Sequence, residues 1–267
     1  MLPWNIVEQA NTREGTLELR QRGEKDFLIL VGGRVLMSST NARSEIILAT
    51  EACRLLADRP APRVLIGGLG MAMTLRAALD TLPAKATVHV AELNPVVVRW
   101  CKGLLAPLSK NALADPRVTL EVGDVARVIA DKQAPYDAIV LDLYEGPNSF
   151  TQRADDPFYS RSALHRTRLA LRADGVFAVW GEDPDERFES RLNRAGFDFE
   201  RKISGRGGSL HAVYIARPNS AKPPRGMSNE QRSKQRQLRN EERRLSEAAD
   251  DQPRSKSKQR RGKTRPR

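Results

Sequence analysis

The chain opens with short runs of apolar and polar residues arranged in the pattern of β-strands. Residues Thr16–Arg20 alternate between the two kinds of side chain. Two further runs, Asp26–Val31 and Arg34–Met37, flank the pair Gly32-Gly33, a combination typical of a hairpin turn. We therefore predict a small N-terminal β-hairpin region over residues 1–43.

From residue 44 the pattern becomes an alternation of helices and short apolar strands. Apolar residues recur at helical spacing from Ser44 to Leu56, and the segment ends before Pro60. Strands are predicted at Val64–Ile66, Thr87–Ala91, Val118–Val122, Ala138–Leu141 and Val176–Trp180. Helices are predicted up to Leu79 and over Pro95–Leu105, Ser162–Leu171 and Glu186–Ala195. A terminal antiparallel pair is predicted near Phe197–Ile203 and Leu210–Ile215. Alternating βα units predict an α/β domain over 44–217, with a mostly parallel sheet covered by helices on both faces.

The last fifty residues differ from the rest in charge and in apolar content. Residues 218–267 hold 16 Lys+Arg and 6 Asp+Glu, so they carry +10 of the chain's net charge of +12. They contain almost no large apolar side chains and cannot build a core, so we predict a disordered basic tail. Such a tail would attract nucleic acid or another acidic surface, although a purely solubilising extension is equally compatible with its composition.

Several classes of protein are excluded or disfavoured by what the sequence lacks. No apolar run reaches about 18 residues, so no transmembrane helix is predicted. The start, Met1–Trp4, does not have the form of a secretory signal. The two cysteines, Cys53 and Cys101, are too few for a disulfide scaffold or a cysteine-built zinc site, and the three histidines have no ligand spacing. We therefore expect a cytoplasmic protein with no bound metal and no membrane association.

Residues suited to a nucleotide-like ligand stand at the ends of four predicted strands. A glycine-rich turn, Gly67-Gly68-Leu69-Gly70, follows the first of these strands and leads into a helix. Acidic residues follow the next three: Glu92, Asp124 and Asp142. Because the carboxyl ends of parallel strands meet at one edge, we expect these groups to surround one ligand. Glu92 could then bind ribose hydroxyls, Asp124 an adenine amino group, and Asp142 would face the reacting centre.

The form of the turn narrows the choice of nucleoside. A dinucleotide fingerprint requires G-x-G-x-x-G, but the third glycine position here is Met73. No G-K-[ST] follows the strand, so the turn is not a P-loop. These features fit S-adenosylmethionine-type ligands better than NAD.

Four motifs together resemble the spermidine synthase (polyamine aminopropyltransferase) superfamily, and most closely its bacterial spermidine-synthase-like branch. They are Val64–Met71, Ala91–Asn94, Val122–Val125 and Tyr136–Asp142. The resemblance implies a class I methyltransferase-like (Rossmann-like) fold that uses decarboxylated S-adenosylmethionine to transfer an aminopropyl group to an amine. It also implies that the glycine turn, Glu92, Asp124 and Val125 bind the nucleoside, and that Asp142 acts as the base.

The sequence departs from the family pattern mainly on the acceptor side. Gly70 stands where the family usually has an aspartate that meets the aminopropyl amine, and the loop after Asp142 reads Leu143-Tyr144-Glu145-Gly146-Pro147 instead of S-S-D-P. Glu145 is therefore the candidate second catalytic carboxylate, and Tyr144 a candidate acceptor contact. The Tyr and Gln expected near the first helix are replaced in that region by Ser44-Glu45, so Glu45 is a further candidate for acceptor binding.

Other functions remain open at the level of sequence. S-adenosylmethionine itself could be the co-substrate, which would make the protein a methyltransferase on the same fold. A non-catalytic protein that binds a nucleoside or associates with RNA through residues 218–267 is a third alternative. The small-molecule amine acceptor is not identified, and a homodimer is expected only from the family resemblance.

Overall fold

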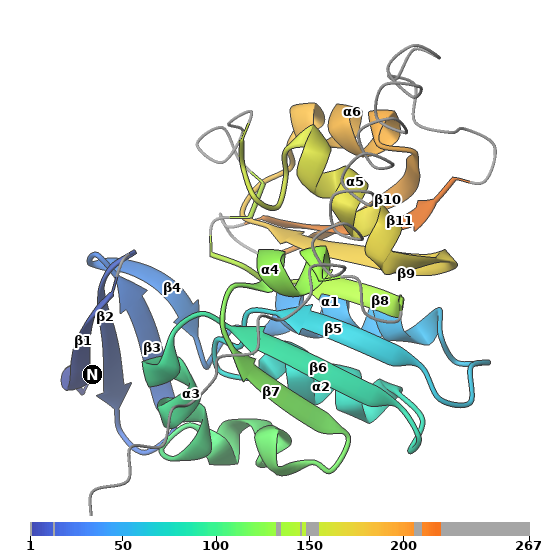
Figure 1. Ribbon diagram of the computed structural model, residues 1–267. Helices are drawn as coiled ribbons and strands as arrows, with labels where there is room; N and C mark the ends of the chain where they lie inside the picture. The colour runs from blue at the N-terminus through green and yellow to red at the C-terminus, as the bar shows by residue number, and fades with distance from the viewer. Residues whose placement is uncertain are drawn as a thin grey trace, which may run out of the picture. The chain divides into compact units, whose positions relative to one another are not determined.

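Two β-sheets organise the protein, as Figure 1 shows. The computed structural model describes residues 2–12, 14–131, 135–144, 146–147, 155–205 and 210–219. Glu145 and almost all of the predicted basic tail therefore lie outside the described residues. Among the described residues, no helix is long and apolar enough to cross a membrane.

The N-terminal sheet has four antiparallel strands in the order β1-β2-β3-β4. They are β1 (Asn5–Thr12), β2 (Gly15–Arg22), β3 (Asp26–Val31) and β4 (Arg34–Ser38). The hairpin at Gly32-Gly33 is confirmed, because β3 pairs antiparallel with β4 across it. Strand β1 was not predicted, because its side chains are mostly exposed and polar, and its pairing with β2 defines it instead.

The second sheet has seven strands in the order β10-β11-β9-β8-β5-β6-β7. They are β5 (Arg63–Gly67), β6 (Thr87–Glu92), β7 (Val118–Val122), β8 (Tyr136–Leu141), β9 (Leu171–Gly181), β10 (Phe197–Ser204) and β11 (His211–Pro218). Strands β5 to β9 are mutually parallel, and β10 and β11 form the predicted antiparallel pair. The chain leaves β5 toward β6 and later returns to β8 on its other side, so the topological switch point lies between β5 and β8.

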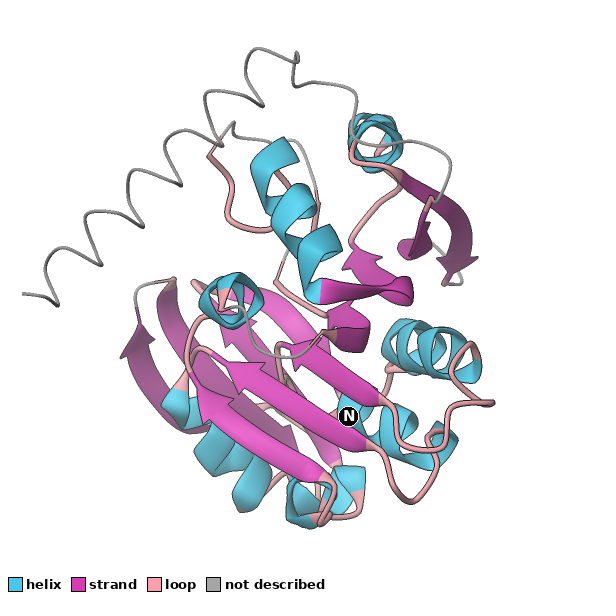
Figure 2. Ribbon diagram, turned by 45° about the vertical axis from the view of Figure 1, so that its right-hand side comes forward, coloured by secondary structure: helices cyan, strands magenta, loops and turns pink. Residues whose placement is uncertain are grey.

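Helices cover both faces of this sheet (Figure 2). Helices α1 (Arg43–Arg54), α2 (Met73–Thr81) and α3 (Pro95–Lys102) pack on the first face, and α4 (Val125–Ala130), α5 (Arg161–Ala170) and α6 (Glu186–Arg194) pack on the second. Successive strand residues serve the two faces alternately: Val64 and Ile66 join the first core, and Leu65 joins the second. The α/β fold with a covered, mostly parallel sheet is thus confirmed.

Some local features differ from the sequence prediction. The helix expected to reach Leu105 ends at Lys102, because the chain turns at Gly103 into short 3₁₀ segments, Ala106–Ser109 and Ala112–Ala114. Helix α4 was not predicted, since six residues give too short an apolar period. Strand β9 begins at Leu171, five residues before the predicted start, because Tyr136 of β8 pairs with that residue.

The N-terminal sheet is fastened to the larger sheet by buried apolar residues and by one polar cluster. Leu17, Leu19 and Ile29 belong to the same core as the first face of the seven-stranded sheet. Glu8 of β1 accepts a hydrogen bond of 2.8 Å from Nε1 of Trp100 in α3, and it also pairs with Arg99. These contacts fix the N-terminal sheet beside the carboxyl edge of the parallel strands.

Candidate functional site: a carboxylate-lined cavity

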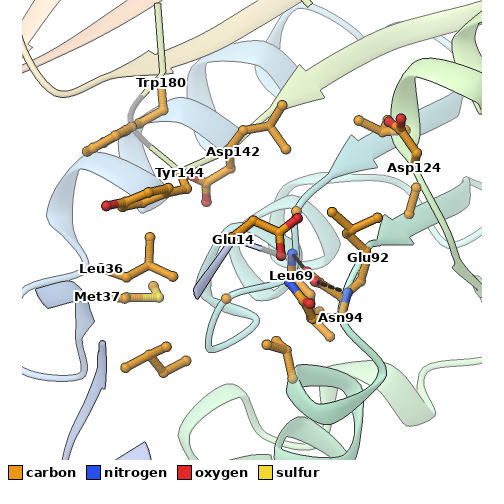
Figure 3. Close-up of a pocket in the computed structure, with 18 of the residues that line it drawn as sticks. Glu14, Leu36, Met37, Leu69, Glu92, Asn94, Asp124, Asp142, Tyr144 and Trp180 are labelled. Atoms are coloured by element: carbon orange, nitrogen blue, oxygen red, sulfur yellow. Dashed lines mark hydrogen bonds between the residues drawn. The ribbon is translucent and has the colours of Figure 1, made fainter. Parts of the chain in front are cut away.

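A cavity of about 310 Å³ lies where the carboxyl edge of the parallel strands faces the N-terminal sheet (Figure 3). The larger sheet contributes residues that follow β5, β6, β7 and β8. The N-terminal sheet contributes four apolar side chains, namely Leu17, Ile29, Leu36 and Met37. The structure therefore brings all four sequence-predicted strand ends to one place, as the parallel topology requires.

The glycine turn is shaped by its contacts within the protein. Gly68 has φ +89°, and a Cβ there would lie 2.2 Å from the backbone oxygen of Asp142. Gly70 has φ +51°, and a Cβ there would lie 2.9 Å from Sδ of Met37. The turn thus passes closely between β8 and the N-terminal sheet. At Gly68 the backbone leaves no room for a side chain, whereas at Gly70 a side chain would require the Met37 thioether to move. Gly68, Leu69 and Gly70 line the cavity, whereas Gly67 does not line it.

Glu92, at the end of β6, is held by the backbone of two loops. Its Oε2 accepts a hydrogen bond of 2.8 Å from the Leu69 amide, and its Oε1 accepts one of 2.8 Å from the Asn94 amide (Figure 3). Burial raises the pKa of this carboxyl, and the two amides partly oppose that effect. Each oxygen retains a second lone pair, so the carboxylate can still accept hydrogen bonds from a ligand hydroxyl.

Asp124 follows β7 and caps helix α4. Its Oδ1 accepts a hydrogen bond of 2.8 Å from the Ala126 amide, which fixes the side chain at the helix start. Both Asp124 and the buried Val125 line the cavity on the same side as Glu92. This side therefore offers one acidic and one apolar contact next to a second carboxylate, an arrangement that suits an adenine ring and its amino group.

Asp142 follows β8 and faces the opposite end of the cavity. Its Oδ2 accepts a short hydrogen bond from the Thr74 hydroxyl in α2. Burial raises the pKa of Asp142 to about 7, with a further increase from the negative charge of Glu45 and a decrease from the Thr74 hydrogen bond. Glu45, in the first turn of α1, accepts a hydrogen bond of 2.6 Å from its neighbour Ser44. A carboxyl that titrates near neutrality can accept a proton and later release it.

Aromatic side chains form the wall beside Asp142. Tyr144, Phe158 and Trp180 all line the cavity, and Figure 3 shows Tyr144 and Trp180 next to Asp142. Trp180 is half-buried, and it both packs against the core of the first face and lines the cavity. The guanidinium of Arg34 lies 5.7 Å from the centre of the Tyr144 ring. Glu145, predicted as a second catalytic carboxylate, lies outside the described residues.

The charge of the cavity is opposite to that of the chain. Five of its lining residues are acidic: Glu14, Glu45, Glu92, Asp124 and Asp142. Among the described residues that line it, none is Lys, Arg or His, although the chain carries +12 overall. Such a cavity favours a cationic ligand. No group of three or more His, Cys, Asp or Glu side chains among the described residues is arranged to hold a metal ion.

Sequence reasoning missed the residues that reach the cavity from other parts of the fold. Glu14 lies in the turn between β1 and β2, and Met37 lies in β4, far from the strand-end motifs in sequence. Neither residue has a local pattern that marks it as a site residue. Only the packing of the N-terminal sheet against the glycine turn brings them there.

Comparisons with known proteins agree on the family to which this chain is similar. Residues 54–193 match the spermine/spermidine synthase domain. The polyamine aminopropyltransferase of Clostridium tetani is 27% identical over 136 residues, which cover 48% of this chain and 44% of that protein. Polyamine aminopropyltransferase 1 of Pseudomonas aeruginosa is 30% identical over 149 residues (47% and 51%), and putrescine N-methyltransferase 3 of Nicotiana tabacum is 33% identical over 129 residues (48% and 32%).

Solved structures show the same fold. The spermidine synthase of Thermotoga maritima superposes with a TM-score of 0.65 at 17% identity, covering 84% of this chain and 76% of that one. A spermidine synthase in complex with the transition state analogue AdoDATO gives a TM-score of 0.63 at 15% identity, covering 84% and 81%. This chain spans about half or less of the length of the curated relatives that it matches. Because the domain match covers more than half of this chain, the protein belongs to the spermine/spermidine synthase family.

Proposed function

We propose that this protein is a transferase that takes decarboxylated S-adenosylmethionine as donor and alkylates an amine acceptor, with aminopropyl transfer as the reaction. The observation that carries the proposal is the set of five carboxylates around one cavity in a chain of the spermine/spermidine synthase family. Both substrates are cationic, since the donor carries a sulfonium and an ammonium and the acceptor is an amine. Glu92, Asp124 and Val125 would hold the nucleoside, and Asp142 would face the reacting atoms.

The lining also favours the decarboxylated donor over S-adenosylmethionine. Intact S-adenosylmethionine carries an additional carboxylate on its side chain. Among the described lining residues no cationic side chain is present to receive it, and five carboxylates would repel it. Removing that carboxyl group therefore removes an unfavourable interaction with this cavity.

In the transfer step the acceptor nitrogen attacks the aminopropyl carbon that is bonded to sulfur. The new C–N bond forms as the C–S bond breaks, and the electron pair leaves with sulfur as the neutral thioether of methylthioadenosine. The nitrogen must lose one proton, which passes to Asp142 or to water. Alignment of nitrogen, carbon and sulfur in line would supply much of the acceleration.

The raised pKa of Asp142 lowers the free-energy cost of transferring a proton to it from the amine. With reference values of about 10.4 for an alkylamine and about 3.9 for Asp, the proton transfer costs roughly 9 kcal/mol. A carboxyl with a pKa of about 7 reduces that cost to roughly 5 kcal/mol. Desolvation of the amine against Tyr144 and Trp180 would lower the amine's own pKa and reduce the cost further. Glu45 is proposed to help bind the acceptor, with Tyr144 at its side.

Replacement of Asp142 tests this assignment. Asp142→Asn keeps the size of the side chain and can still accept the Thr74 hydrogen bond, so methylthioadenosine should bind as it does to the wild type. Turnover should fall by about 100-fold or more, as expected for the loss of a general base. Calorimetry measures binding and mass spectrometry of the products measures turnover, with Asp58→Asn on the surface as the control. Unchanged turnover in Asp142→Asn would remove Asp142 from the mechanism.

Methyl transfer from S-adenosylmethionine is the second candidate. The observation that favours it is the 33% identity to the putrescine N-methyltransferases of Nicotiana. Incubation of the protein with each donor and a panel of di- and polyamines distinguishes the two reactions, because the product gains either an aminopropyl or a methyl group. A methylated product formed only with the intact donor would establish the second candidate over the first.

A further inference from the structure

Glu14 enters the cavity from the N-terminal sheet. It lies in the turn that joins β1 to β2, just before Gly15, which has φ +122°. The Thr12 hydroxyl holds this turn, because it accepts a hydrogen bond of 3.2 Å from the Glu14 amide and donates one of 2.7 Å to the Gly15 carbonyl. The position of Glu14 is therefore fixed by the backbone of the turn, while its side chain is free to extend.

Its carboxylate lies over the middle of the cavity. Figure 3 shows the Glu14 side chain beside Leu69 of the glycine turn, between Asp142 on one side and Glu92 on the other. The negative charge of Glu14 contributes to the raised pKa of Glu92, which places the two carboxyls within electrostatic range of each other.

Glu14 differs from the other acidic residues of the cavity in its bonding. Glu92 accepts from Leu69 and Asn94, Asp124 from Ala126, Asp142 from Thr74 and Glu45 from Ser44. The Glu14 carboxylate makes no hydrogen bond or ion pair with any described residue. It is exposed, so its negative charge is hydrated and available to a ligand.

We infer that Glu14 binds the ammonium group of the donor's side chain and thereby selects the decarboxylated donor. This inference rests on the proposed function. With the nucleoside at Glu92 and Asp124 and the reacting carbon near Asp142, the donor side chain starts at the middle of the cavity, under Glu14. The backbone of the glycine turn beneath it carries no acidic side chain, and the Met37 thioether fills the space at Gly70. A carboxylate from the facing sheet supplies the charge that this region otherwise lacks.

The same charge discriminates between donors. A carboxylate attracts the ammonium of the decarboxylated donor and repels the carboxylate that intact S-adenosylmethionine carries on the same carbon chain. Methylthioadenosine has neither group, so it reports on the nucleoside site alone. The three ligands together separate the side-chain contact from all others.

Glu14→Gln tests the inference, with Glu24→Gln as the matched control in the turn between β2 and β3. Calorimetry on the full chain should show that Glu14→Gln binds decarboxylated S-adenosylmethionine about tenfold more weakly. It should bind methylthioadenosine as the wild type does, and it should bind intact S-adenosylmethionine equally well or better. Glu24→Gln should match the wild type for all three ligands, and Glu14→Asp should recover part of the lost affinity.

Four outcomes would overturn it. Equal affinity of wild type and Glu14→Gln for the decarboxylated donor would show that Glu14 does not bind the ammonium group. A parallel loss of methylthioadenosine binding would assign Glu14 to the nucleoside site or to the fold. A raised KM for the acceptor with unchanged donor affinity would assign it to the acceptor. Failure of the wild type to bind any of the three ligands would instead refute the proposed function, and this inference with it.

Discussion

At the scale of single residues, the cavity is assembled from carboxyls in different states. Glu92 is bound to two amides, whereas Asp142 accepts a hydrogen bond from the Thr74 hydroxyl and is destabilised as an anion by burial and by Glu45. This contrast suits a site in which one carboxyl binds and another exchanges a proton. In the ligand-free protein the ionised Asp142 carboxylate also lowers the free energy of unfolding, because folding must bury that charge in the cavity.

This cost gives a prediction about stability. Asp142 has a folded pKa of about 7, above its ordinary value of 3.8. The protein is therefore not destabilised by Asp142 below pH 4, where the carboxyl is protonated in both states. The free energy of unfolding falls as the pH rises from 4 through 7, because the unfolded state releases the proton first. Asp142→Asn should stabilise the ligand-free protein at pH 8 by up to about 4 kcal/mol, the equivalent of roughly three pKa units, and leave it unchanged at pH 4.

Urea unfolding of Asp142→Asn and wild type at the two pH values measures this difference. Asp58→Asn, at an exposed position, should show no such pH-dependent gain. A variant that is equally stable at both values would mean that the Asp142 anion is not destabilised in the folded protein.

At the scale of elements, the two ends of strand β8 carry aspartates with different roles, one structural and one facing the cavity. Asp137, at its amino end, is buried and accepts hydrogen bonds from Arg59 and from the Arg63 amide, and it pairs with Arg172. Asp142 follows the other end, five residues and about 16 Å away. The first aspartate ties β5, β8 and β9 together at their amino ends, and the second faces the cavity.

We therefore expect Asp137→Ala to lower the free energy of unfolding by about 3 kcal/mol, because it removes a buried carboxylate that accepts from two arginines and from the Arg63 amide. Methylthioadenosine affinity of the protein that remains folded should not change. Asp174→Ala is the matched control, since Asp174 also pairs with Arg59 but is 79% exposed, so its loss should cost less than 1 kcal/mol. Comparable losses in the two variants, measured by chemical denaturation, would contradict this account.

At the scale of the whole molecule, charge divides the chain into two parts. The cavity is acidic, while residues 220–267 hold 16 Lys+Arg and 6 Asp+Glu. The described residues that line the cavity all lie between Glu14 and Trp180, so we expect donor binding and turnover not to need this segment. Asn219 is the last of the described residues, and two hydrogen bonds attach its backbone to the fold. Its amide donates to the Gly196 carbonyl at 2.7 Å, and its carbonyl accepts from Arg168.

Truncation after residue 219 should consequently leave donor binding and turnover within twofold of the full chain. Binding of the full chain to RNA at low salt should weaken steeply as salt increases, and the truncated chain should not bind RNA. Calorimetry for the donor and filter binding for RNA measure the two properties. A large fall in turnover on truncation would show that the basic segment takes part in catalysis.

Most of the large sheet could be predicted from the sequence, and so could the acidic residues at its strand ends. Buried strands read as short apolar runs, and parallel topology sends their ends to one edge, so Glu92, Asp124 and Asp142 could be grouped without coordinates. Strand β1 and helix α4 could not be predicted, because pairing and capping define them and their own apolar periods do not.

The sequence by itself determined the alternation of strands and helices, the glycine turn and the order of the carboxylates, because these depend on local periodicity and on one rule of topology. Only the tertiary structure decided that Glu14, Met37 and Trp180 line the same cavity. They reach it by the packing of the N-terminal sheet and by the path of β9, and contacts between distant segments leave no local pattern in the chain. The raised pKa of Asp142 also depends on the tertiary structure, because burial and the nearby Glu45 raise it only after folding.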